Sequence, residues 1–170
     1  MKTKKLVLCS LFMAIICVST LVIQVPSPMN GYVNLGDVFV LLAAWIMGPL
    51  YGLTAAGIGS MLADIITGYA YYAPATLIIK ALVACVAAFI VSGALKNVKL
   101  NFLHYLTAGL ASEIIMVLGY FAYAGIILKN GLAAASSIPG NIVQAVVCTL
   151  IASWVIVLLK KYKITDKISE

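Results

Sequence analysis

Long apolar runs, separated by short segments that hold most of the charged and turn-forming residues, make up almost the whole chain. A membrane-spanning helix needs about 20 mostly apolar residues. All of the runs except a short second one come close to that length. We therefore predict an all-α integral membrane protein, in which residues 1–170 form a single domain, a six-transmembrane-helix bundle. The predicted spans are residues 6–23, 36–47, 50–67, 74–95, 102–128 and 138–159.

The segment 36–67 is long enough to be read in two ways. As one helix it would be about 48 Å long, whereas the bilayer core is about 30 Å thick. Gly48 and Pro49 lie at its middle, and proline breaks or kinks a helix. We therefore expect two spans joined by a tight turn.

The first apolar run resembles a signal peptide, because it follows three lysines. A signal peptide has an apolar stretch of only about 7–15 residues and ends in a small-residue cleavage site. This run is longer and ends in Gln24-Val-Pro-Ser-Pro28. We interpret it as a retained first span.

The lysines fix the predicted orientation. With a cytoplasmic N-terminus and six spans, nine lysines fall inside, Lys129 falls outside and Lys80 lies within a span. Inner loops of membrane proteins carry such an excess of positive charge, and an odd number of spans would put one lysine-rich terminus outside. We predict that the N and C termini are both cytoplasmic. The inner lysines are Lys2, Lys4, Lys5, Lys96, Lys99, Lys160, Lys161, Lys163 and Lys167.

Composition agrees with a membrane protein and excludes other classes. Hydrophobic residues make up 64% of the chain and charged residues 9%, against about 25% charged in soluble domains. This excludes a soluble enzyme and a disordered chain. The net charge of +6 comes from lysines alone, and the lack of arginine argues against a nucleic-acid partner.

No pattern of catalytic or metal-binding residues is present. The chain has no phosphate-binding GxxxxGK[ST] loop, no HExxH and no GxSxG, so we expect no catalytic residue, no metal and no cofactor. Cys9, Cys17, Cys85 and Cys148 lie in apolar runs without a CxxC pair. We interpret them as small buried hydrophobes, and His104 as an interfacial residue.

Two of the predicted outer loops have unusual compositions. Residues 24–35 are uncharged but contain two prolines, two asparagines and a glycine, which is typical of an ordered, turn-rich loop. This loop is either a passive connector or a lid over a pocket. Residues 68–74 contain three tyrosines, which form either an aromatic belt at the membrane surface or a stacking surface, with Tyr71 or Tyr72 against a ligand.

Polar residues inside the spans are the candidate binding site, because ionisable groups in a bilayer are costly and usually functional. Counted along the helices, Asp64, Lys80, Asn141 and Gln144 lie about 5–9 Å below the outer surface. The alternative is structural, with Asp64 and Lys80 as a neutralising pair and the two amides as interhelical contacts. The full predicted substrate-binding set is Asn34, Asp37, Asp64, Lys80, Glu113, Tyr120, Asn141 and Gln144.

Two of these residues suggest specific ligand chemistry. Lys80, if paired with a carboxylate, stays charged and can hold an anionic ligand group. Glu113 can accept a hydrogen bond from a ring N–H or an amine, with Tyr120 on the same face. Because the polar groups concentrate in the outer half, a proton relay through the membrane is poorly supported.

Small residues recur four apart on the first and third predicted spans. Ser10 and Ala14 form one such pair, and Gly52, Ala56, Ser60 and Asp64 form a column. Such faces let helices approach closely in lipid. They serve either packing within this chain or docking to another membrane protein.

Five segments resemble the substrate-binding S components of energy-coupling-factor (ECF) vitamin transporters, in the branch for riboflavin, hydroxymethylpyrimidine or vitamin B6-type ligands. The resemblance covers nearly the whole chain. It rests on Tyr32-Val-Asn-Leu-Gly-Asp37, Gly48-Pro-Leu-Tyr-Gly52, Gly57-Ile-Gly-Ser-Met-Leu-Ala-Asp64, Tyr72-Ala-Pro-Ala75 with Lys80, and Pro139-Gly-Asn-Ile-Val-Gln144.

The resemblance implies a subunit in the plasma membrane of a prokaryote, with no enzymatic activity, that binds a vitamin under its first outer loop. Its partners would be a transmembrane coupling protein and two ATPase subunits, on which the S component docks before toppling inward. Ser10-xxx-Ala14 would replace the family's Ala-xxx-Ala docking motif. The ligand-contacting residues carried over are Asn34, Asp37, Asp64, Lys80, Asn141 and Gln144.

The favoured ligand is a small heteroaromatic vitamin or precursor, pyridoxine-like or hydroxymethylpyrimidine-like, with riboflavin possible, because an Asp64/Lys80 pair suits a small polar ring. Two alternatives remain at this point. An autonomous channel or secondary carrier would need polar groups along the full membrane. An intramembrane enzyme would need a nucleophile or a metal site.

Overall fold

The computed structural model describes residues 2–27, 31–95 and 98–165. It is mostly helical, and the described part contains five helices that are long and apolar enough to cross a membrane. Lys96, Lys167 and residues 28–30 of the first predicted loop lie outside the described residues. The five α-helices are α1 (Lys2–Val22), α2 (Gly36–Ile66), α3 (Ala73–Phe89), α4 (Phe102–Ala122) and α5 (Ile138–Lys161).

Helix α2 consists of two helical arms that meet at a sharp turn, where the chain reverses direction. Gly48 has non-helical torsion angles, φ 76° and ψ −178°, and Pro49 follows it. A Cβ on Gly52 would lie 2.8 Å from the Cα of Ala44, so residues on either side of the break face each other. The structure therefore places a sharp turn at Gly48 and Pro49, where the sequence predicts one.

The first predicted loop forms a β-hairpin, which the all-α prediction missed. Strand β1 (Gln24–Ser27) pairs antiparallel with β2 (Gly31–Asn34), with Val25 opposite Val33. Pro26 lies within β1, and a two-stranded sheet leaves each strand an outer edge where a missing N–H is tolerated. The sequence shows no clear alternation here, which is why composition indicated a loop but not strands.

Three short helical segments complete the chain. The π-helical segments η1 (Ile90–Ala94) and η2 (Tyr123–Ile127) extend α3 and α4, and the 3₁₀ helix η3 (Gly131–Ser137) leads into α5. With these extensions, the membrane-capable segments of the described part are Thr3–Val22, Gly36–Ile66, Ala73–Ala94, Phe102–Ile127 and Gly131–Lys161.

Small residues on α2 pack within the chain. A Cβ on Gly59 would lie 2.7 Å from the Met13 carbonyl oxygen of α1, and one on Gly57 would lie 2.7 Å from the Leu77 carbonyl oxygen of α3. Gly52 and Ala56 are buried in the same way. The Gly52 and Ala56 column is therefore covered by this chain's own helices, whereas Ser10 and Ala14 are exposed on α1.

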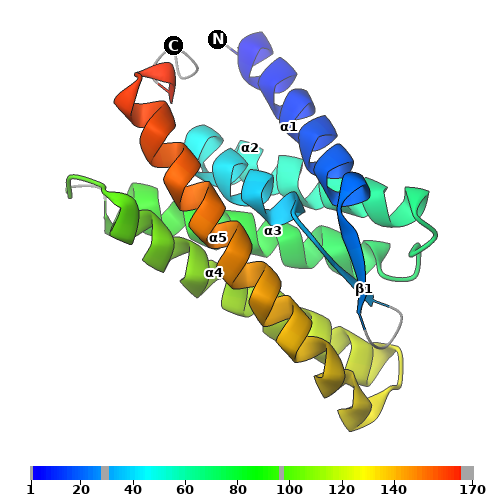
Figure 1. The fold of residues 1–170 in the computed structure, drawn as a ribbon. Helices are drawn as coiled ribbons and strands as arrows, with labels where there is room; N and C mark the ends of the chain where they lie inside the picture. The colour runs from blue at the N-terminus through cyan, green and yellow to red at the C-terminus, as the bar shows by residue number, and fades with distance from the viewer. Residues whose placement is uncertain (1, 28–30, 96–97, 166–170) are drawn as a thin grey trace.

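The start of α1 and the end of α5 lie at one end of the bundle (Figure 1). The β-hairpin lies away from this end, between the end of α1 and the start of α2. The hairpin thus covers one end of the helices, and that end carries the candidate site.

Candidate functional site: a polar pocket beneath the hairpin

A small pocket opens between the hairpin and the helices, with a cavity volume of about 50 Å³. Residues from α1, the hairpin and α2 to α5 contribute to its walls, so segments distant in sequence meet there. The lining residues are Thr20, Gly31, Tyr32, Asn34, Ser60, Asp64, Tyr72, Thr76, Lys80, Tyr120, Ser137, Asn141 and Gln144.

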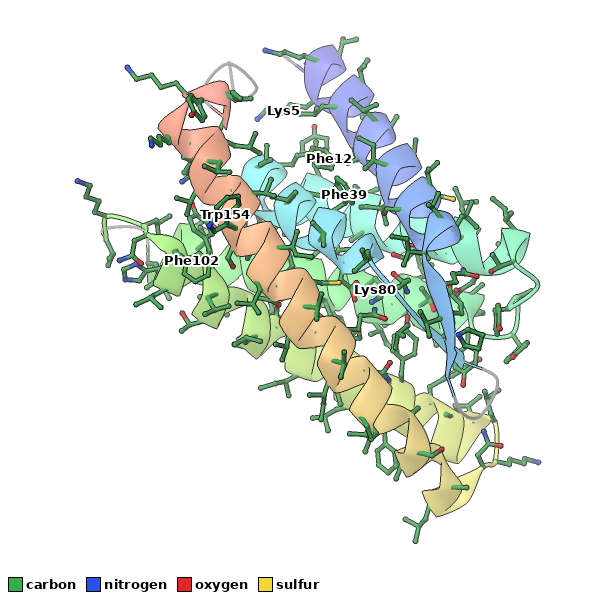
Figure 2. The ribbon with its side chains drawn as sticks, viewed as in Figure 1. Lys5, Phe12, Phe39, Lys80, Phe102 and Trp154 are labelled. Carbon is green, nitrogen blue, oxygen red and sulfur yellow. The ribbon has the colours of Figure 1, made fainter. Side chains whose placement is uncertain are left out.

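The charge of Lys80 is neutralised by Asp37. Its Nζ lies 2.5 Å from Asp37 Oδ1, and both side chains are almost completely buried. A second contact joins Nζ to Met116 Sδ at 3.0 Å. Figure 2 shows Lys80 in the interior of the bundle, among the helices. The expectation of a pair between Asp64 and Lys80 is therefore wrong, because Asp37 at the start of α2 reaches the lysine first.

Hydrogen bonds extend this ion pair to the hairpin. Gln144 Nε2 donates to Asp37 Oδ2 at 2.5 Å, and Gln144 Oε1 accepts from the Asn34 N–H at 2.7 Å. Asn34 Oδ1 in turn accepts from the Gly36 N–H at 2.7 Å. We call Lys80, Asp37, Gln144 and Asn34 the paired network. Because its polar groups satisfy one another, it holds the end of β2 against α3 and α5.

Asp64, in contrast, keeps one oxygen uncommitted. The Tyr32 hydroxyl donates to Asp64 Oδ1, while Oδ2 is buried without a hydrogen-bond partner among the described residues. Burial and the neighbouring Asp64 carboxylate raise the pKa of the Tyr32 phenol well above its usual range, so the phenol keeps its proton and remains a donor. A buried acceptor that lacks a donor suits a ligand N–H or O–H.

Tyrosines form one wall of the pocket. The Tyr32 and Tyr69 ring centroids lie 4.9 Å apart, and Tyr72 lies 6.1 Å from Tyr120 and 5.6 Å from Tyr123. Thr76 and Tyr120 share a hydrogen bond of 3.0 Å between their hydroxyls. Tilted and edge-to-face contacts of this kind order aromatic rings, so the wall presents a firm apolar surface to a flat molecule.

Most of the predicted site residues come together in the structure. Asp37 and Glu113 do not line the pocket. Asp37 lies behind Lys80, and both carboxylate oxygens of Glu113 are buried without a partner among the described residues. The predicted residues that do line the pocket are Asn34, Asp64, Lys80, Tyr120, Asn141 and Gln144.

Sequence reasoning missed seven lining residues. Tyr32 and Gly31 lie in the loop that was considered as a lid, and Tyr72 was one of the two tyrosines considered for stacking. Thr20, Ser60, Thr76 and Ser137 are small hydroxyl residues in apolar surroundings, where they give no signal, because such residues are common in membrane helices. Ser60 was already placed on the same helix face as Asp64 by the column of residues four apart, but it was interpreted as a packing residue.

Hydrogen-bonding side chains and aromatic rings line the pocket. The described residues contain no group of three His, Cys, Asp or Glu side chains that could hold a metal ion. The four cysteines are free, and three of them are buried. The uncommitted groups are a carboxylate oxygen at Asp64 and the amide of Asn141, beside the tyrosine wall. This arrangement can hold a planar, polar molecule by hydrogen bonds and ring contacts.

Comparisons with known proteins bear on the family and the fold of this chain. Residues 1–163 match the sequence model of a family described as "ECF-type riboflavin transporter, S component". An uncharacterized protein from Pyrococcus woesei is 35% identical over 147 residues, which cover 86% of this chain and 95% of the relative. A solved structure described as the S component of a bacterial ECF transporter has a similar fold, with a TM-score of 0.71 at 22% identity, over 95% of this chain and 98% of the other.

Proposed function

Since this chain belongs to the family of ECF-type riboflavin transporter S components, we propose that it captures a heteroaromatic vitamin in the pocket beneath the hairpin. It then delivers the vitamin inward together with an ATP-driven partner module. The chain's family is one of transport subunits and not of enzymes, and its apolar helices place it in a membrane.

One observation supports this proposal most strongly. A buried carboxylate oxygen of Asp64, which has no hydrogen-bond partner among the described residues, and the buried side chain of Asn141 line one pocket. Unsatisfied polar groups inside a protein cost about 1–3 kcal/mol each. A ligand that satisfies them recovers that cost, which favours binding over a purely structural role.

We place riboflavin first among the candidate ligands, in line with the family description. The preference for a small pyridine or pyrimidine rested on a charged Asp64/Lys80 pair, and Lys80 is instead paired with Asp37. The imide N–H of the riboflavin ring system can donate to the free oxygen of Asp64, and its flat rings can pack against the tyrosines of the pocket.

The test is a direct competition between these vitamins. The purified protein is titrated with riboflavin, pyridoxine and hydroxymethylpyrimidine by calorimetry, after mass spectrometry of any small molecule that co-purifies. We expect riboflavin to bind most tightly and Asn141→Leu to weaken it, while Asn101→Ala, at the cap of α4, has no effect. Equal binding by wild type and Asn141→Leu would contradict the assignment of the pocket.

We further propose six membrane crossings with both termini in the cytoplasm of a prokaryotic cell. The reversal at Gly48 supports two crossings by α2, and the lysines supply the inner positive charge. The hairpin and pocket would then face outward. Labelling of single cysteines placed beside Lys129 and Lys161, from each side of intact cells, tests this orientation: the first should react outside and the second only inside.

Docking to a transmembrane coupling protein and two ATPase subunits is assigned to α1. Ser10 and Ala14 lie one turn apart on its exposed side, and small side chains let a partner helix approach closely. Ala14→Leu should reduce co-purification of the partner module without changing vitamin affinity. Leu11→Phe, at an exposed position that already carries a large side chain, is the matched control and should leave assembly intact.

An autonomous carrier is tested with the same material. Proteoliposomes that contain only this chain should not accumulate vitamin, whereas those that also contain the ATP-driven module should. Uptake by the chain alone would favour the carrier and contradict the subunit assignment.

A further inference from the structure

Five buried polar side chains lie apart from the pocket and have no use in vitamin binding. They are contributed by α2, α4 and α5, and each is at most 9% exposed. Each carries at least one nitrogen or oxygen without a hydrogen-bond partner among the described residues. We call this set the inner column: Trp45, Tyr105, Glu113, Thr149 and Ser153.

Thr149 and Ser153 lack the hydrogen bond that several other hydroxyl side chains in this chain make to their own helix. Serine and threonine in helices usually donate to a carbonyl one turn earlier. Four other described residues make this bond at 2.7–3.1 Å, whereas Thr149 Oγ1 and Ser153 Oγ have no partner among the described residues. Their hydroxyls therefore remain available to another partner. The residues that follow the usual pattern are Ser10, Thr54, Ser92 and Thr107.

The packing of α4 against α5 shows that these side chains occupy successive levels. Met116 contacts Gln144 at 3.5 Å between Sδ and Nε2, and Thr149 lies against Gly109. Because the two helices run in opposite directions, one turn further along brings Tyr105 level with Ser153. Helix α2 joins at this level, since the Trp45 and Tyr105 ring centroids lie 5.0 Å apart.

Glu113 lies at the deep end of the column and Tyr105 at its other end. Eight residues of α4 separate them, a rise of about 12 Å. The Lys160 ammonium lies 5.2 Å from the centre of the Tyr105 ring, and Lys160 is exposed near the end of α5. The column therefore runs from a charged, solvent-exposed end to a carboxylate that lies deep within the bundle.

We propose that the inner column is a water-binding site, in which a row of about three or four bound waters spaced at hydrogen-bond distance links Glu113 to the end of the bundle near Lys160. Buried polar groups in a membrane interior must be paired, and no described side chain or backbone group pairs these. Water is a small partner that is both donor and acceptor, and so it matches an indole N–H, three hydroxyls and a carboxyl group. This site is independent of the proposed vitamin pocket.

Hydroxyl-radical footprinting tests the site, because radicals formed from bound water modify the side chains beside it. The full-length protein is irradiated in lipid nanodiscs and its oxidised residues are quantified. Trp45 and Phe12 have the same exposed fraction, 9%, so Phe12 is the dry control. We expect Trp45 and Tyr105 to be oxidised faster than Phe12 after correction for intrinsic ring reactivity. Rates no higher than that of Phe12 overturn the proposal.

A second measurement uses the sign of a stability change. In a dry column, Thr149→Val removes an unsatisfied hydroxyl and raises the apparent Tm. In a hydrated column it removes a bound water's partner and lowers the Tm by about 2–4 °C, the shift expected for about 1 kcal/mol in a chain of this size. Thr54→Val, whose hydroxyl is paired within its own helix, is the control. A rise in Tm specific to Thr149→Val overturns the proposal.

Discussion

The paired network and the inner column lie in the same bundle, and both involve α2, α4 or α5. They differ in whether their buried polar groups have hydrogen-bond partners. Near the hairpin, Lys80, Asp37 and Gln144 satisfy one another at distances near 2.5 Å. Toward the termini, Glu113, Thr149 and Ser153 are just as buried but have no partner among the described residues. Burial alone therefore does not indicate what a polar residue does in this fold.

The difference shows which interactions hold the structure and which are left for other molecules. The paired network joins four segments through side chains that already satisfy each other, so it fixes the hairpin. The free oxygen of Asp64, the amide of Asn141 and the inner column keep hydrogen-bonding capacity in reserve. A small molecule can satisfy the first two, and water the last.

The largest expected effect comes from breaking the ion pair. Asp37→Ala leaves the Lys80 charge buried without its partner, and this should lower the free energy of unfolding by about 3–5 kcal/mol. The double variant Asp37→Leu with Lys80→Met replaces the pair with apolar groups and should recover most of the loss. Unfolding in detergent, followed by circular dichroism, measures both. A double variant as unstable as the single one would contradict the pairing.

The second-largest effect is expected for Asp64, whose Oδ2 has no hydrogen-bond partner among the described residues. Asp64→Asn removes a charge-assisted hydrogen bond to the ligand, worth about 1.5–3 kcal/mol, and so should weaken riboflavin binding by roughly 10- to 100-fold. Because Asp64 forms no ion pair among the described residues, the stability of the protein without vitamin should change little. If Asp64→Asn lowers stability as much as affinity, Asp64 has a structural role like that of Asp37, and its assignment to ligand binding is wrong.

A smaller effect is expected where the paired network meets the backbone. Asn34→Ala removes the side-chain acceptor for the Gly36 N–H and should cost about 1 kcal/mol. Amide hydrogen exchange at Gly36 should accelerate accordingly. Asn141→Ala is the matched control, because the Asn141 side chain makes no such backbone contact. If both variants leave the Gly36 exchange rate unchanged, the hairpin is held by other contacts.

The smallest effect concerns alkaline pH. The pKa of Tyr32 is raised in the folded protein by burial and by Asp64, while in the unfolded chain a tyrosine ionises near pH 10. The unfolded state therefore loses its proton first, and stability should fall as the pH rises above about 10. Tyr32→Phe should lose part of this pH dependence in thermal melts, and an unchanged profile would contradict it.

Hydropathy predicted the helices well, because a bilayer-spanning segment needs length and apolarity, which a single sequence displays directly. The turn at Gly48 and Pro49 was also predictable, since the backbone chemistry of these residues is local. The hairpin was not predicted as strands. Its pairing depends on where α1 ends and α2 begins, and Pro26 interrupts any strand pattern.

For the candidate site, the sequence indicated how deep each polar residue lies along its helix, but not the direction in which its side chain points. Rise per residue places Asp64, Lys80, Asn141 and Gln144 near one level, and all four line the pocket. Depth does not give the rotation of a helix about its axis, so Asp37 was not identified as the partner of Lys80. The same limit applies to Glu113, which lies deeper and away from the pocket.

The small-residue faces illustrate a further limit. A column such as Gly52 and Ala56 shows that something packs closely there, but not which helix does so. Packing of α2 against itself, against α1 and against α3 uses most of these positions within the chain. Packing within the chain can be distinguished from docking to a partner only when the contacts between segments distant in sequence are known.

The single-residue reversal at Gly48 has a mechanical consequence. Its two arms carry Asp37 near one tip and Asp64 near the other, and Gly52 packs directly on Ala44. If α2 tilts as a unit, both carboxylates move through the same arc, and Asp64 in the pocket keeps its distance from Asp37 in the paired network.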